Sequence, residues 1–183
     1  MKYQNELVDL IEHDPLIMET LSVVRSLNLN DCWIGAGFIR NKVWDILHDQ
    51  KTTDFNDIDV VFFDDTTISV HLENEIEQQL TAISPKMKWS VKNQARMYIR
   101  NNHLKYNDTE NAISYWPETA TAVAARLSKD DKVEVLAPYG LNDLFNLIIR
   151  PTPNTSLIVF QERMSEKQWK KQWGNLKLID AFV

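Results

Sequence analysis

The stretch FNDIDVVFFDD, residues 55–65, constrains the fold most strongly, because its period of two predicts a buried strand. One face of that strand carries Ile58, Val60 and Phe62, and the other begins with Asp57 and Asp59 and continues with Val61 and Phe63. Two carboxylates about 7 Å apart on one face repel each other and lose hydration when the strand is buried. A hydrophobic core gains nothing from such a pair, so we expect the two aspartates to have a function.

The composition and charge of the chain limit the kinds of protein that it can be. The 183 residues are 44% hydrophobic and 25% charged, which is enough for one sizeable core. We expect a cytoplasmic protein, because the chain has no apolar run of about 18 residues, an N-terminus too acidic for a secretory signal, and a single cysteine, Cys32. The net charge of −6 disfavours non-specific binding to nucleic acid, although the lysines of residues 164–177 form a local basic patch.

Segments typical of strands alternate with segments typical of helices along the chain. Strands are predicted at 32–35, 55–65, 86–93 and 131–138, and a polar loop at 49–56. Helices are predicted before 13, at 15–28, 38–48, 68–83, 117–128 and 141–150, and in a last segment capped by Ser165 with Gln168 and ended by Gly174. This order indicates the α/β or α+β class, with one mixed sheet flanked by helices. We expect a single domain over 1–183, with an N-terminal helical segment at about 1–30 and a C-terminal helical appendage at about 155–183.

Two glycines mark a second functional feature. Gly35 and Gly37 are two of only four glycines, and they lie directly between a predicted strand and a predicted helix. Glycine at such a turn can adopt a positive φ and lets a ligand approach the backbone closely. The N–H groups at the start of the following helix favour an anion such as phosphate. Together with the aspartate pair, which suits divalent cations, this pattern indicates a site for a metal-bound nucleotide.

The order of these features resembles a known signature. GAGFIRNKVWDILH followed by NDIDVVFFD is similar to the strand, glycine turn, helix and Asp-hydrophobic-Asp strand of the DNA polymerase β-like nucleotidyltransferase superfamily. The segments WSVKNQARM, WPETATAVAARL and APYGLNDLFNLIIRPTP resemble, more narrowly, a bacterial family of small nucleotidyltransferase-like proteins. The narrower resemblance extends from about residue 33 to residue 153.

The resemblance implies metal-dependent transfer of a nucleoside monophosphate from an NTP to a hydroxyl-type acceptor. Gly35 and Gly37 match the turn glycines, while Asp57 and Asp59 match the ligands of Mg²⁺ or Mn²⁺. The turn departs from the usual Gly-Gly or Gly-Ser, because Ala36 intervenes.

A third catalytic carboxylate is not evident in the sequence. The strand face that carries Trp89 and Val91 continues to Asn93, which is an amide, and Glu134 is the better charged candidate. The predicted catalytic set is therefore Asp57, Asp59, Asn93 and Glu134.

Several cations are candidates for holding the triphosphate. Lys92, Arg96 and Arg40 could neutralise the charge that develops on a transferring phosphoryl group, or they could equally belong to a solvated surface. Trp116 could line an acceptor pocket, but core packing is favoured. The predicted nucleotide-binding set is Gly35, Ala36, Gly37, Arg40, Lys92 and Arg96.

Two other functions compete with catalysis. Without a third carboxylate, the chain could be a catalytically impaired nucleotide-binding module, or an interaction protein of the toxin–antitoxin type with a protein partner. The expected partners are an NTP and an acceptor that the sequence does not identify. A membrane is not expected, and nucleic acid is disfavoured by the acidic charge.

Overall fold

The computed structural model describes residues 1–51 and 57–180. Part of the polar loop predicted at 49–56, which includes Asp54, and the last three residues of the predicted appendage lie outside this range. The chain begins with two packed helices, α1 (Gln4–Glu12) and α2 (Pro15–Ser26). Asp14 caps α2, because its side chain accepts hydrogen bonds from the backbone N–H groups of Leu16 and Ile17.

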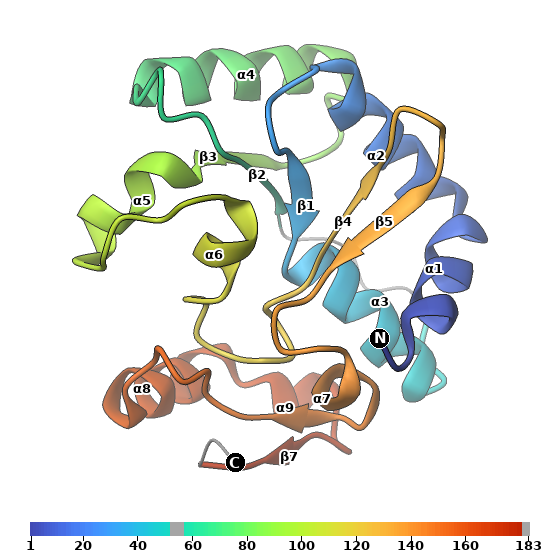
Figure 1. Ribbon diagram of the computed structural model, residues 1–183. Helices are drawn as coiled ribbons and strands as arrows, with labels where there is room; N and C mark the ends of the chain where they lie inside the picture. The colour runs from blue at the N-terminus through green and yellow to red at the C-terminus, as the bar shows by residue number, and fades with distance from the viewer. Residues whose placement is uncertain (52–56, 181–183) are drawn as a thin grey trace.

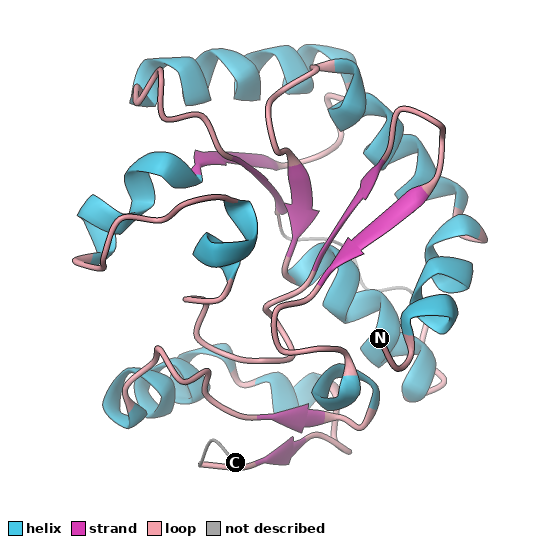
Figure 2. Cartoon of the chain, viewed as in Figure 1, coloured by secondary structure: helices cyan, strands magenta, loops and turns pink. Residues whose placement is uncertain are grey.

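A five-stranded mixed sheet forms the centre of the described chain, as the sequence predicts (Figures 1 and 2). Its strands in spatial order are β3 (Trp89–Asn93), β2 (Ile58–Phe62), β1 (Trp33–Gly35), β4 (Ala124–Leu127) and β5 (Val133–Leu136). Strands β2 and β3 run parallel, and the other neighbours are antiparallel. The remaining helices that flank the sheet are α3 (Gly37–Leu47), α4 (Val70–Ile83), α5 (Gln94–Asn101) and α6 (Thr109–Ile113).

The two faces of the sheet differ in chemistry. One face presents Ile34, Val60, Val91 and Ala125, which are fully buried in the main core together with residues of α1, α2 and α4. Residues paired across neighbouring strands point to the same side of a sheet. The pairings Ser90 with Asp59, Asp59 with Gly35 and Gly35 with Ala124 therefore place these four residues in one row on the opposite face, which we call the site face.

The helix predicted at 117–128 is wrong. Residues 124–127 form β4, a strand near the centre of the sheet, and only turns and a bridge between Glu118 and Pro151 precede it. Alanine is the best helix former, and Pro117 with Glu118 suggested a helix start. The tertiary context overrides this propensity, because the backbone of Ala124 and Ala125 pairs with strands on both sides and their side chains are fully buried on the two faces of the sheet.

The C-terminal part continues with α7 (Asn142–Phe145), β6 (Ile148–Ile149), α8 (Leu157–Lys167), α9 (Trp169–Gln172) and β7 (Lys177–Leu178). The predicted helix at 141–150 is thus shorter than expected and is followed by β6. The capping box predicted at Ser165 is also wrong, since Ser156 caps α8 and Ser165 lies inside this helix.

Aromatic rings join the C-terminal helices to α3. Trp169 and Trp173 pack edge-on against Trp44, with ring centroids 5.5 and 5.1 Å apart, and the indole N–H of Trp173 donates to Asp45 at 2.8 Å. In Figure 1, α8 and α9 lie below the five-stranded sheet. No helix in the described part of the chain has both the length and the apolarity needed to cross a membrane.

Candidate active site

The glycine turn links β1 to α3 at the end of the site face. The sequence suggests a positive φ at the two glycines, but neither Gly35 nor Gly37 adopts one; Ala36 does so instead, with φ 51°. Gly35 is required for a different reason, because a Cβ there would lie 2.4 Å from Cη2 of Trp116. The turn is therefore closely packed, because the Trp116 ring lies against its backbone at Gly35.

The two aspartates lie across from this turn. Asp59 pairs directly with Gly35, and Asp57 is exposed just before β2 begins. Burial raises the pKa of Asp59 above its ordinary value, and the negative charge of Asp57 raises it further. The Ser90 hydroxyl and the positive charges of Arg40 and Lys167 partly oppose this shift. The pair thus concentrates negative charge beside the turn.

Arg40 lies one helical turn beyond the glycines, and its guanidinium is enclosed by aromatic rings. Its Cζ lies 4.8 Å from the Trp44 ring centroid and 4.4 Å from that of Trp169, and the residue is only 6% exposed. Its hydrogen bonds go to Oδ1 of Asn41, at 2.7 and 3.2 Å. Burial lowers the pKa of Arg40 to about 10. Among the described residues no carboxylate forms an ion pair with Arg40, so this buried cation is neutralised only from a distance.

A buried acid that the sequence analysis missed faces this cation. Glu118 is fully buried; one carboxylate oxygen accepts from Nε of Arg163, on α8, and the other accepts from the Thr121 hydroxyl at 2.7 Å. Its charge is the largest of those that raise the pKa of Arg40. The sequence pattern places Glu118 in the first turn of the helix predicted at 117–128, and it does not predict the contacts of Glu118 with Arg163 and Thr121.

A cavity of about 230 Å³ opens on the site face next to Asp59. It is lined by Ala36, Asp59, Val61, Lys92, Gln94, Met97, Asn101, Tyr106, Ala112, Trp116, Pro117, Thr121 and Arg163. Ala36 of the turn, Asp59, Arg163 and a partly aromatic wall therefore line one cavity. Trp116 lines this hollow as well as packing on the sheet.

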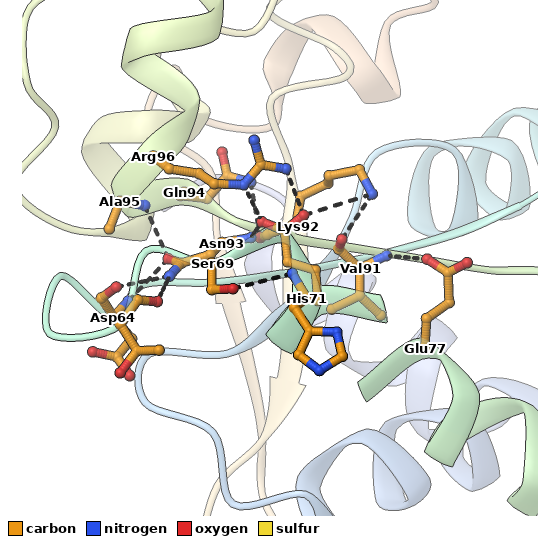
Figure 3. A network of polar contacts seen from close by, with 12 residues as sticks. Asp64, Ser69, His71, Glu77, Val91, Lys92, Asn93, Gln94, Ala95 and Arg96 are labelled. Atoms are coloured by element: carbon orange, nitrogen blue, oxygen red, sulfur yellow. Dashed lines mark hydrogen bonds and ion pairs between the residues drawn. The ribbon is translucent and has the colours of Figure 1, made fainter. Parts of the chain in front are cut away.

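Asn93, predicted as a catalytic residue, is not part of this hollow. It pairs with Phe62, so it faces the side of the sheet opposite to Asp59. Its side-chain oxygen accepts from the amides of Asp64 and Ala95, and its nitrogen donates to the carbonyls of Asp64 and Thr67 (Figure 3). These four bonds use its whole hydrogen-bonding capacity, so Asn93 holds the start of α5 in place.

The basic pair predicted as triphosphate clamps, Lys92 and Arg96, lies beside Glu73 of α4. Both Nε and Nη2 of Arg96 donate to the carboxylate of Glu73, each at 2.5 Å, and Glu73 is 1% exposed (Figure 3). Arg96 is therefore a structural ion-pair partner between α5 and α4. Lys92 lines the cavity, but its ammonium group donates to the Val91 carbonyl at 2.8 Å and lies 4.0 Å from Glu73.

Glu134, the other acid predicted for catalysis, lies on the far edge of the sheet. It pairs with Arg126 on β4, and its carboxylate accepts from Nε of that arginine at 2.6 Å. Three strand spacings of about 4.8 Å separate β5 from β2, roughly 14 Å in all. Within the described residues, no three His, Cys, Asp or Glu side chains come together as a metal cluster. The roles proposed for Asp57, Asp59, Arg40 and the turn stay predictions.

A mixed sheet whose glycine turn faces a strand that begins with two carboxylates defines the class of nucleotidyltransferases. The profile of a family described as nucleotidyltransferase matches residues 22–178, and the chain belongs to this family. The resemblance stated from the sequence is thereby confirmed. No curated protein is significantly similar to the chain in sequence.

Solved structures support the same fold. An NMR structure described as a CCA-adding enzyme head domain is 34% identical, with a TM-score of 0.87, over 99% of this chain and 98% of that one. The Thermotoga maritima CCA-adding enzyme complexed with tRNA is 14% identical, with a TM-score of 0.59, over 96% of this chain and 42% of that one. A CCA-adding enzyme in complex with ATP is 15% identical, with a TM-score of 0.57, over 98% of this chain and 42% of that one. The chain thus spans less than half the length of the latter two, for which the likeness shows the fold alone.

Proposed function

We propose that this nucleotidyltransferase moves a nucleoside monophosphate from an NTP, bound with Mg²⁺ or Mn²⁺, to a hydroxyl-bearing acceptor. The observation that carries the proposal is the pairing of Asp59 with Gly35, which brings the acid pair against the turn at the start of α3. A carboxylate pair and a helix N-terminus have opposite preferences for charge. A dication and a triphosphate bound together satisfy both.

The donor set fits a hard dication. Mg²⁺ is usually held by one or two carboxylates together with phosphate oxygens and water, so Asp57 and Asp59 are sufficient on the protein side. The raised pKa of Asp59, caused by burial and by the charge of Asp57, reflects a concentration of negative charge that a dication would relieve. When bound, the ion would neutralise the phosphates and favour ionisation of the acceptor hydroxyl.

The chain's own cations complete the phosphate side. Arg40 lies over two adjacent indoles, and its Nη2 would lie 3.4 Å from a Cβ on Gly37, so its charge reaches the turn. A guanidinium in this position would bind a phosphoryl oxygen and hold the NTP in orientation for attack. Arg163, fixed by Glu118 at the wall of the cavity, adds a second positive charge.

The identity of the acceptor is inferred less directly than that of the nucleotide. The 34% identical structure is described as a CCA-adding enzyme head domain, and a CCA-adding enzyme of the same fold is complexed with tRNA, so a hydroxyl of tRNA is the first acceptor to test. A net charge of −6 opposes extensive contact with RNA, so a small hydroxyl compound is the second.

The test uses the double substitution of Asp57 and Asp59 by alanine. We expect loss of Mg²⁺-dependent NTP binding by calorimetry, and transfer from α-labelled NTP reduced at least about 100-fold, because metal-ion catalysis contributes several kcal/mol. Asp65→Ala is the matched control, since Asp65 is exposed beyond the end of β2. Unchanged circular dichroism would show that the fold is intact, and unchanged NTP affinity in the double variant would contradict the proposal.

A further inference from the structure

We propose that the part of the cavity beyond Asp59 holds the nucleotide base, and that Gln94 selects bases that carry an exocyclic amino group. The inference rests on the proposed function, because it assumes that the phosphates lie at the glycine turn. It assigns base selection to residues of α5 and of the segment around α6. The acid pair and the turn contact the metal and the phosphates in the proposed function, so they do not account for base selection.

The direction of the cavity follows from strand register. Asp59 and Ala36 line its phosphate end, and Val61 follows Asp59 by two residues on the same face of β2. Val61 pairs with Lys92, and Gln94 begins α5 just beyond it. The cavity therefore runs along β2 from the acid pair toward α5, so a nucleotide with phosphates at the turn directs its base toward Gln94.

The walls at this end suit a flat, largely apolar group. Val61, Met97 and Ala112 provide apolar surface, and Tyr106 and Trp116 provide aromatic rings. Tyr106 is 2% exposed, and its hydroxyl is bonded to Nδ1 of His103, so the ring is fixed in place. Aromatic side chains stack on bases with a favourable free energy that varies little with base identity. The volume of about 230 Å³ is below the roughly 300–1,000 Å³ of pockets that enclose whole ligands, and fits one part of a nucleotide.

Gln94 adds the polar contact that stacking cannot supply. It is 4% exposed and lines the cavity, and its Nε2 donates to the Lys92 carbonyl at 3.2 Å. A carbonyl can only accept, so this bond assigns the amide orientation and leaves Oε1 as the atom available to a ligand. Among the described residues no donor binds Oε1. An acceptor held in this way binds the amino group of adenine or cytosine and repels the oxo group of hypoxanthine or uracil.

Matched nucleotides test this inference. We expect wild-type protein with Mg²⁺ to bind ATP more tightly than ITP, and CTP more tightly than UTP, each by about threefold to tenfold, which corresponds to one hydrogen bond. Each pair differs in little more than an amino group in place of an oxo group. In Gln94→Met, which keeps the length of the side chain but lacks the acceptor, both ratios should fall to within about twofold. Gln78→Met, on the exposed side of α4, should keep them.

The outcomes separate the two proposals. Mg²⁺-dependent binding of all four nucleotides with equal affinity, or a preference that survives in Gln94→Met, would overturn base selection by Gln94 and leave the proposed function standing. Absence of Mg²⁺-dependent binding of any NTP and of inorganic tripolyphosphate would overturn the proposed function itself. If Gln94→Met does not fold, the side-chain amide signal of Gln94 in ¹⁵N-labelled wild-type protein decides, since it should shift with ATP and not with tripolyphosphate.

Discussion

Two arginines that look alike in the sequence have opposite surroundings in the structure. Arg96 reaches from α5 to Glu73 and forms a forked ion pair with a carboxylate that is 1% exposed. Arg40 is itself buried, lies over the rings of Trp44 and Trp169, and has no ion-pair partner among the described residues. A cation that already has its carboxylate contributes to stability. One that is buried against aromatic faces retains the capacity to bind an anion.

The groups that each arginine already contacts therefore distinguish a binding residue from a structural one. Arg40 follows the glycine turn and Arg96 follows β3, and both spacings are compatible with a role in phosphate binding, so spacing along the chain cannot distinguish them. The glutamate that neutralises Arg96 lies on α4, and the indole that covers one side of Arg40 lies on α9. Each discriminating contact is therefore made by a segment remote in sequence.

The largest effect on stability is expected at Arg96. Arg96→Met leaves Glu73 buried without its forked partner, and breaking such a pair costs about 3 kcal/mol in the free energy of unfolding. NTP affinity of the folded protein should stay within about twofold of wild type. Urea denaturation measures the first quantity and calorimetry the second. A stable variant that has lost nucleotide binding would reverse the assignment of the two arginines.

Arg40 should show the opposite pattern. Arg40→Met removes a charge-assisted hydrogen bond to phosphate, so we expect NTP affinity to fall about tenfold to 100-fold. Stability should be unchanged or higher, because the buried charge is replaced by an apolar side chain that still packs between the rings. The same two measurements apply, and wild-type affinity for Mg²⁺·ATP in this variant would exclude Arg40 from the site.

A smaller effect is expected at Trp169, which touches Arg40 but lies outside the cavity lining. Trp169→Leu removes one of the two indoles that hold the guanidinium, and a cation–π contact of about 1 kcal/mol corresponds to a fivefold loss of NTP affinity. The loss should disappear when Arg40 is already Met, because the two residues then act through one contact. Lys170→Ala, on the exposed side of α9, is the control. Additive losses in the double variant would show that Trp169 acts independently.

Local patterns predicted most of the fold correctly. The strand at the aspartate pair, the glycine turn and the helix after the turn were predicted from the alternation of apolar and polar residues and from the positions of the glycines. These are local features of the sequence. The helix predicted at 117–128 is wrong, because alanine-rich sequence favours a helix unless strand pairing and burial override that propensity. Here Ala124 lies between Gly35 and Leu136 in the sheet, a constraint that only the pairing reveals.

The site was predicted less completely than the fold. Asn93 looked suitable because its strand face was continuous with Trp89 and Val91, yet the register of β3 against β2 turns that face away from Asp59. The sequence assigns no individual role to Glu118, Gln94 or Trp169, because each acquires its contacts in the site through tertiary packing. The motif thus identifies the reacting centre, while the walls and supports around it come from the folded chain.

The indole of Trp169 has a consequence for how the protein is made. Ribosomes synthesise the glycine turn and the aspartates long before α9, so a nascent chain carries the recognisable motif while Arg40 is still uncovered on one side. Nucleotide binding should therefore reach its full affinity only after α9 has been added, and a chain that stops before it would be recognised as a nucleotidyltransferase by its sequence yet bind NTP more weakly.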